Sequence, residues 1–166
     1  HLLNVIQKKL YDTFFHEHIF YFSLYNLKQI FEKRKYSIHN VEMTKSKGGS
    51  LRIIFKKNEK CYSTKVNKLI NKIIEKEKKY LFNSKAYISF GKYLEDKRIK
   101  IEKILENYDK KIVVFGASVA TTTLINKFNL SKKVIYFIDD NKIMHNKLSP
   151  INKKPVFSPL KFFNDK

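Results

Sequence analysis

The sequence contains very little cysteine, proline or glycine: its 166 residues include one cysteine, three prolines and four glycines. The single cysteine, Cys61, excludes an internal disulfide framework and a cysteine-based zinc site within the chain. No run approaches the roughly 20 apolar residues that a membrane-spanning helix needs, and no export signal is visible. These absences favour a cytoplasmic protein, and a hydrophobic content of 43% is enough for an ordinary core.

Acidic residues are also scarce, with 15 Asp and Glu against 35 Lys and Arg, which gives a formal net charge of +20. Such an excess predicts an anionic partner such as nucleic acid or phosphate groups. The charge is mostly lysine spread over the whole chain, a pattern that an AT-rich genome also produces. Arginine, which dominates bidentate contacts to bases and phosphates, occurs only as Arg34, Arg52 and Arg98. This scarcity argues against a specific nucleic-acid protein.

The N-terminal part carries a cluster of three proton-transferring side chains, His16-Glu17-His18. Apolar residues at helical spacing in residues 2–10 predict the last turns of a helix, so we expect the chain to be part of a longer polypeptide. Phe14 and Phe15 then predict a short buried strand with the cluster at its carboxyl end, where ligands bind in open α/β sheets. The alternative is a strand end whose histidines bond only to backbone groups.

The next hundred residues alternate between helical and strand patterns. A helix capped by Ser23 is predicted to run to Lys35, and glycines 48 and 49 predict a tight turn in an antiparallel hairpin. Two longer amphipathic helices should follow, with solvated lysines on their outer faces. The predicted strands cover residues 36–43 and 51–55, the helices cover 63–80 and 84–108, and a linker covers 107–111.

The last third changes character. Residues 111–120 form an apolar strand that enters a turn of small residues, and residues 133–140 form a second apolar strand ending in two acids. With a helix at 121–128 between them, they predict a βαβ unit whose strands are parallel and buried. Gly116 allows a sharp turn, and the following helix N-terminus suits a phosphate. The dinucleotide signal is weak because this motif has a single glycine.

Several of these stretches, taken together, resemble the SAM-dependent sugar C-methyltransferases. The resemblance lies in residues 12–18 (DTFFHEH), 21–24 (YFSL) and 48–52 (GGSLR), and more loosely in Gly116-Ala117, Asp139, Pro150 and Ser158-Pro159. It implies an α/β fold: the end of a class I methyltransferase (Rossmann-like) domain, then helices, then a small Rossmann-like βαβ domain. The implied domains are residues 1–60, the C-terminal portion of the methyltransferase domain with the His-Glu-His segment, residues 61–109, a helical connector, and residues 110–166, a Rossmann-like C-terminal domain. Within the last of these, Pro150, Pro155 and Pro159 predict an irregular tail before Leu160-Lys161-Phe162-Phe163.

The chain also departs from the pattern of these enzymes. Phe15 stands where the family usually has a tyrosine whose hydroxyl assists at the sugar ketone, and Lys47 stands where histidine is usual. Met144, Asn146 and Ile151 replace a common lysine and two glycines. Nothing matches the zinc-binding region or the glycine-rich SAM loop that precede the His-Glu-His segment in the family. The chain is therefore expected to be the C-terminal part of such an enzyme, inactive alone.

The resemblance implies that a base removes a proton next to the ketone of a deoxysugar nucleotide and that the enolate is methylated. His18 is the expected base, since imidazole titrates near neutral pH. Glu17 would orient it, and His16 would contact the substrate or hold the loop. Phe15 and Tyr21 are expected at the sugar, and the diphosphate would lie near Gly116, Ala117 and Ser118. Because Phe15 lacks a hydroxyl, another donor or a water must stabilise the oxyanion.

Two other functions remain open from the sequence. The chain could be a non-catalytic structural or binding fragment, or a basic protein that binds nucleic acid or other anions, although no nucleic-acid motif is present. His16 and His18 have a spacing that could hold a metal on a strand, but no third ligand is evident. The expected cofactor is S-adenosyl-L-methionine, with its main binding loop outside this chain.

Overall fold

The computed structural model describes residues 1–60, 63–107 and 111–165. Cys61 and residues 108–110 of the predicted linker lie outside these ranges. Contacts within the chain divide it into two compact units: the first combines His1–Leu10 with His18–Tyr93, and the second combines Tyr11–Glu17 with the chain from Leu94 onward. No helix within the described ranges is both long enough and apolar enough to cross a membrane.

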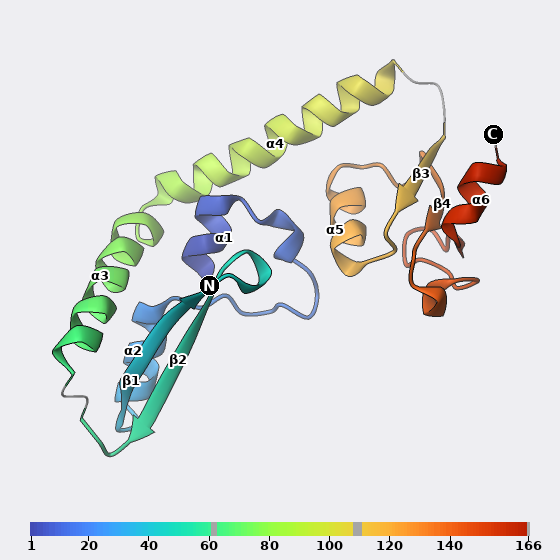
Figure 1. Ribbon diagram of the computed structural model, residues 1–166. Coiled ribbons are helices and arrows are strands. Elements are labelled where there is room, and N and C mark those ends of the chain that lie inside the picture. The colour runs from blue at the N-terminus through green and yellow to red at the C-terminus, as the bar shows by residue number, and fades with distance from the viewer. Residues whose placement is uncertain (61–62, 108–110, 166) are drawn as a thin grey trace. The chain divides into compact units, whose positions relative to one another are not determined.

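The first unit is a β-hairpin covered by helices (Figure 1). Its elements are α1 (Leu2–Lys8), α2 (Leu24–Glu32), β1 (Tyr36–Thr44), η2 (Ser46–Gly48), β2 (Ser50–Lys57) and α3 (Thr64–Leu81). The predicted cap of α2 is confirmed, because the Ser23 hydroxyl accepts from the N–H of Asn26 at 3.1 Å. Ser63 caps α3 in the same way. The helices and the hairpin predicted for this part are therefore confirmed.

The hairpin and two helices form the core of the first unit. β1 and β2 are antiparallel and pair from Tyr36 with Lys57 to Thr44 with Ser50. The α2 and α3 helices pack against β1 and against each other. Their apolar faces bury a cluster made of Leu24, Ile38, Val41 and Ile70. The link between the strands is the 3-10 helix η2, a longer connection than the tight turn expected from the glycine pair.

The second unit is built around a three-stranded parallel sheet. Its elements are η1 (Tyr11–Thr13), β3 (Ile112–Phe115), α5 (Val119–Lys127), β4 (Val134–Ile138), η3 (Lys142–Met144), β5 (Val156–Phe157) and α6 (Pro159–Asn164). Helix α4 (Ser84–Glu106) begins in the first unit and continues into this one. The strand order is β3-β4-β5, and both pairs are parallel. The predicted βαβ unit and the α/β class of the chain are thus confirmed.

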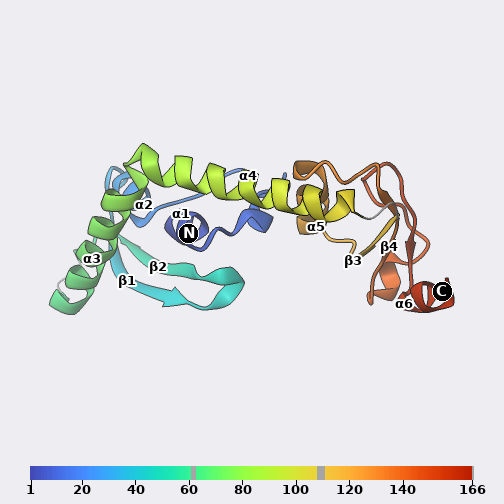
Figure 2. The ribbon, with the colours of Figure 1, turned by 90° about the horizontal axis from the view of Figure 1, so that it is seen from above.

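Helices cover both faces of this sheet, with α5 on one side and α6 on the other (Figures 1 and 2). Neighbouring residues of β4 face opposite ways, as in any strand. Phe137 packs with Ile125 of α5, whereas the Tyr136 hydroxyl donates to the Asp165 carboxylate beyond α6 at 2.7 Å. The central strand β4 therefore contributes buried residues to both faces of the sheet.

Two expectations for this region are wrong. The tail that contains Pro150, Pro155 and Pro159 is not irregular throughout, because β5 and the start of α6 lie within it. A strand of two residues flanked by Pro155 and Ser158-Pro159 is too short to show any alternation in the sequence. The expectation that both strands of the βαβ unit are buried also fails, since Phe115 is 62% exposed. β3 lies at the edge of the sheet, so within the part of the chain that the structure describes one side of it has no neighbouring strand.

Candidate functional site

The His-Glu-His segment, residues 16–18, follows a turn and not a strand. Tyr11–Thr13 forms the 3-10 helix η1, and the N–H of Phe14 donates to the Tyr11 carbonyl at 3.0 Å. Phe14 and Phe15 are half-buried and belong to no strand, so the predicted buried strand is wrong. A strand needs a neighbour to satisfy its backbone groups, whereas η1 satisfies them locally and packs against α5 of the second unit.

His16 and Glu17 lie on the surface. Their side chains are 78% and 70% exposed, and His16 Nε2 is 3.9 Å from Glu17 Oε1. An exposed ion pair at this distance contributes little to stability. The carboxylate that the sequence assigns to orienting His18 therefore lies beside His16.

His18 and Tyr21 form a second pair. Both side chains are half-buried, and their rings meet edge to face with centroids 6.4 Å apart. They belong to the first unit, whereas residues 11–17 belong to the second. Within the units, the structure therefore brings together His18 with Tyr21 and, separately, His16 with Glu17.

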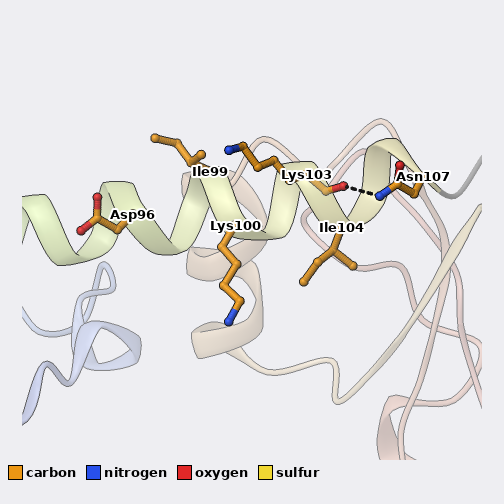
Figure 3. A pocket seen from close by; sticks show the side chains of 6 residues that line it. All are labelled: Asp96, Ile99, Lys100, Lys103, Ile104 and Asn107. Atoms are coloured by element: carbon orange, nitrogen blue, oxygen red, sulfur yellow. Dashed lines mark hydrogen bonds between the residues drawn. The ribbon is translucent and has the colours of Figure 1, made fainter.

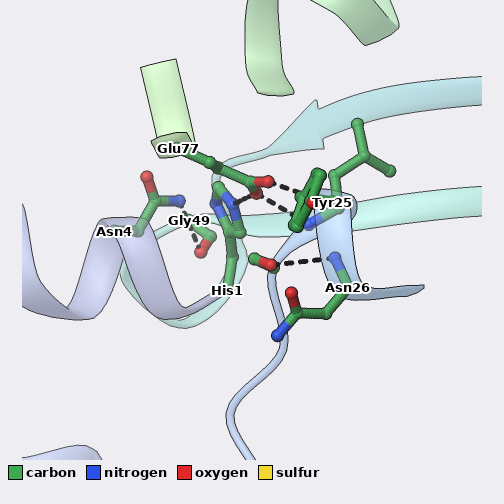
Figure 4. Close-up of polar contacts among 8 residues, drawn as sticks. His1, Asn4, Tyr25, Asn26, Gly49 and Glu77 are labelled. Carbon is green, nitrogen blue, oxygen red and sulfur yellow. Dashed lines mark hydrogen bonds and ion pairs between the residues drawn. The ribbon is translucent and has the colours of Figure 1, made fainter. Parts of the chain in front are cut away.

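The chain after Tyr21 enters α2 at a buried junction (Figure 4). Ser23 is 3% exposed, and Glu77 of α3 is fully buried. The Glu77 carboxylate accepts from the N–H groups of Leu24 at 2.7 Å and Tyr25 at 2.8 Å. Burial raises the pKa of Glu77 above its ordinary value, and the bonds from Tyr25 and Leu24 oppose this shift. The first turn of α2 is thus capped by a carboxylate from another helix.

Helix α1 completes this junction. His1 Nε2 lies 2.6 Å from Glu77 Oε1, with both side chains buried. The N–H of Leu2 donates to the carbonyl of Phe22 at 2.9 Å. Three helices therefore meet at the residues that directly follow the His18 and Tyr21 pair.

The glycine pair of the Gly-Gly-Ser-x-Arg motif is packed against α1. The Asn4 side chain, 7% exposed, donates from Nδ2 to the Gly49 carbonyl at 2.9 Å. Gly49 has φ +116°, and a Cβ there would lie 2.7 Å from that same Nδ2 atom. Arg52 of the motif is on the surface, where its side chain pairs with Glu42 at 2.5 Å. In this unit the motif fixes the hairpin onto α1.

The second candidate site is the loop after β3, Gly116-Ala117-Ser118, at the carboxyl edge of the parallel sheet. Gly116 has φ +93° and donates its N–H to the carbonyl of Ile138 at 2.8 Å. Ser118 caps α5 by accepting from the N–H of Thr121 at 3.1 Å. The predicted turn at Gly116 leading into a helix N-terminus is confirmed.

Asp139, the first residue after β4, connects the carboxyl ends of all three strands. Its Oδ2 atom accepts from the Ala117 N–H at 2.7 Å, and Oδ1 accepts from the Asn141 N–H at 2.8 Å. Its own N–H donates to the Phe157 carbonyl at 3.1 Å, and its carbonyl accepts from His145 Nε2 at 2.7 Å. A carboxylate therefore already occupies one backbone donor of the loop that was expected to hold a diphosphate.

Sequence reasoning missed the contacts of Glu77 and treated Asp139 only as the acid that ends a strand. A signal for Glu77 existed, because it continues the apolar stripe of α3, three and four residues after Ile74 and Ile73. A charged residue at such a position predicts a buried partner. The partners themselves are far away in sequence and could not be identified from it.

Two surface hollows lie away from these residues. One, of about 450 Å³, runs along the second half of α4 (Figure 3), and another, of about 500 Å³, lies between α2, β1 and α3. In Figure 3 the side chains lining the first hollow leave a single helix in different directions, with no convergent polar groups. No predicted site residue lines either hollow. The lining residues are Asp96, Ile99, Lys100, Lys103, Ile104 and Asn107 for the first, and Lys28, Glu32, Ser37, Ile38, Lys60, Asn67, Ile70 and Asn71 for the second.

Within residues 1–60, 63–107 and 111–165, no group of three His, Cys, Asp or Glu side chains is arranged to hold a metal ion. The pair of His16 and His18 therefore gains no third ligand from the described part of the chain. The shared side that a strand would give the two histidines does not apply, because His16 lies in a turn and His18 in the irregular segment after it.

Comparison with known proteins identifies the family. The C-methyltransferase C-terminal domain matches residues 45–166. The C-methyltransferase NovU of Streptomyces niveus is 23% identical over 163 residues, covering 96% of this chain and 39% of NovU. The chain thus spans about two fifths of the length of this relative. The His-Glu-His segment precedes the part that the family matches. Because the match covers well over half of the chain and agrees with the resemblance seen in the sequence, the chain belongs to the C-methyltransferase C-terminal domain family.

Proposed function

We propose that this chain is the C-terminal part of a SAM-dependent enzyme that methylates a carbon next to the ketone of a deoxysugar nucleotide. The observation that carries the proposal is the pair of His18 and Tyr21, held edge to face directly before the buried junction at α2. A base for carbon acids must be held still, because proton removal depends on its geometry toward the C–H bond. Family membership supplies the reaction class, methyl transfer to carbon.

In the proposed mechanism His18 is the base. The ketone acidifies the neighbouring C–H, the proton passes to an imidazole nitrogen of His18, and the electron pair becomes the enolate. Tyr21, in contact with the imidazole, limits its rotation and borders the sugar. His16, which is exposed beside Glu17, would contact the substrate or hold the loop. Phe15 offers no hydroxyl, so the enolate oxygen needs another donor or a water.

The methyl donor would be S-adenosyl-L-methionine, which supplies an electrophilic methyl group. The described residues do not fit it, because the glycine pair at 48–49, in the loop that follows β1, is packed against α1. We therefore place donor binding, and any zinc, in parts of a longer polypeptide. The contribution of this chain is proton removal and binding of the sugar nucleotide, and alone it would be inactive.

The finer description of the fold is part of the same proposal. A two-stranded hairpin is marginal by itself, and Met43 and Ile54 of β1 and β2 are about half exposed. Both features support residues 1–60 as the end of a class I methyltransferase domain. The sheet with helices on both faces supports residues 110–166 as a Rossmann-like domain, with 61–109 as the helical connector. A cytoplasmic location completes the proposal.

The nucleotide diphosphate would bind at Gly116-Ala117-Ser118. The site is at the carboxyl edge of a parallel sheet, where ligands of α/β domains bind. The Asp139 carboxylate, which accepts from the Ala117 N–H, must then either be displaced by the diphosphate or face the ribose hydroxyls.

The test uses the full-length protein that contains this chain and measures methyl transfer to keto-deoxysugar nucleotides. We expect His18→Ala to lower kcat by roughly 10²- to 10⁴-fold, the usual contribution of general base catalysis, with SAM binding retained. His16→Ala should mainly raise KM for the sugar nucleotide. A wild-type protein that binds neither SAM nor sugar nucleotides would contradict the proposal. Salt-sensitive binding to nucleic acid in its place would favour the basic anion-binding alternative.

A further inference from the structure

Glu77 is the only charged side chain that is fully buried in the described part of the chain. Burying a carboxylate is unfavourable unless hydrogen bonds replace its water. Three groups do so here: the N–H groups of Leu24 and Tyr25 and the His1 imidazole, all within 2.8 Å. An apolar side chain on the stripe of α3 would avoid the desolvation, and buried ion pairs replaced in this way often leave proteins as stable or more stable. We therefore infer that the contribution of Glu77 is to fix the positions of the groups that it binds, and not to add stability.

That geometry concerns one short stretch of chain, residues 18–23, which forms neither helix nor strand. Its downstream end is held at three places: the Phe22 carbonyl by the Leu2 N–H, the Ser23 hydroxyl by the Asn26 N–H, and the first turn of α2 by Glu77. The last of these is the one made by a charged group, and charged hydrogen bonds are the stronger and more directional kind.

We propose that Glu77 is a positioning residue for His18. It fixes the first turn of α2, and through Phe22 and Ser23, the two residues between that turn and Tyr21, it fixes Tyr21, whose ring centroid lies 6.4 Å from that of the His18 imidazole. This inference rests on the proposed function, because it names the residue that holds the proposed base in place. Glu77 itself is buried and does not touch the substrate.

The helix offers a matched control. Glu75 lies two residues before Glu77 on the same helix but is exposed. Glu77→Gln keeps the size of the side chain and one acceptor oxygen, yet places an NH2 group against one of two backbone N–H groups. Glu75→Gln makes the same chemical change at the surface.

Both variants are made in the full-length protein, and methyl transfer and hydrogen exchange are measured. We expect Glu77→Gln to lower kcat by roughly 10- to 100-fold, the loss that a misplacement near 1 Å produces, with KM for SAM unchanged. The pH profile of kcat should also shift, because displacing Tyr21 changes the surroundings of the base His18. A merely structural change elsewhere would leave this profile unaltered. Amide exchange across residues 18–25 should accelerate. Glu75→Gln should match the wild type in all of these.

The outcomes separate this inference from the proposed function. A folded Glu77→Gln protein with wild-type kcat, pH profile and exchange would overturn the role of Glu77 while leaving the methyltransferase intact. A wild-type protein without methyl transfer would overturn the proposed function, and exchange at residues 18–25 would still report whether Glu77 holds the segment. If Glu77→Gln does not fold, amide exchange in the wild-type protein provides the test. Exchange at Leu24 and Tyr25 as fast as at residues 18–22 would contradict the proposal that Glu77 holds the first turn of α2.

Discussion

The Asp139 carboxylate holds the Gly116 loop in place, because its Oδ2 atom accepts a 2.7 Å hydrogen bond from the N–H of Ala117. Removing the charge with Asp139→Asn turns one accepting atom into a donor that faces a backbone N–H. We expect a loss of about 1.5–3 kcal/mol in the free energy of unfolding, the range for hydrogen bonds to charged groups. Urea unfolding measures the change. The exposed neighbour Asp140→Asn is the control, and equal stability of both variants would refute the connecting role.

Two glycines provide a matched pair of substitutions with opposite expected signs. Gly49→Ala places a Cβ 2.7 Å from Asn4 Nδ2 at a residue with φ +116°, so we expect a loss of about 1–3 kcal/mol in stability. Gly91→Ala meets no atom within 4 Å inside α4 and should stabilise the protein by about 0.5–1 kcal/mol. Thermal unfolding of the two variants beside the wild type checks both signs. A neutral Gly49→Ala would show that the hairpin is not held tightly on α1.

The pH dependence of stability should contain a contribution from Asp165. Lys161 and Tyr136 both donate to its carboxylate at 2.7 Å and hold its pKa below the ordinary value of 3.8. A lowered pKa in the folded state stabilises the protein above the ordinary pKa, and this contribution is lost as the pH falls through the folded value. We therefore expect Asp165→Asn to lower the melting temperature at neutral pH, with the difference shrinking below about pH 4.

The measurement is a series of melting curves from neutral to acidic pH. Asp96→Asn, an exposed aspartate on α4, is the control for a general loss of negative charge. A difference between Asp165→Asn and the wild type that stays constant with pH would contradict the assignment.

Phe15→Tyr tests whether a missing hydroxyl limits turnover. If the proposed chemistry holds, adding a donor where the resemblance to the sugar C-methyltransferases implies a tyrosine should raise kcat by up to roughly 10²-fold, as one oxyanion donor is worth about 3 kcal/mol. Phe14→Tyr adds the same hydroxyl at a neighbouring half-buried ring and should leave kcat unchanged. Steady-state kinetics of the full-length protein gives the answer. An unchanged rate for Phe15→Tyr would show that another donor already serves the enolate oxygen.

The sequence predicted those parts of the fold that local patterns dictate. The helices α2, α3 and α4 were predictable because apolar residues recur at helical spacing and Ser23 and Ser63 supply caps. The hairpin followed from two apolar runs joined by a glycine pair, and β3-α5-β4 from two long apolar strands around a helix. β5 was missed because two residues between prolines carry no pattern, and the Phe14-Phe15 strand was wrong because no neighbouring strand pairs with it.

The candidate site shows the same division. Composition and spacing by themselves singled out His16, Glu17, His18 and the Gly116 loop, since three side chains that can transfer protons stand side by side and a glycine follows an apolar strand. Tertiary structure decided which of them meet: His18 packs on Tyr21, Glu17 lies beside His16, and Asp139 takes the Ala117 amide. It also buried Glu77, 53 residues from Leu24 in sequence, at the first turn of α2. Contacts between residues so far apart depend on how the faces of the helices pack, and no local pattern in the sequence encodes that.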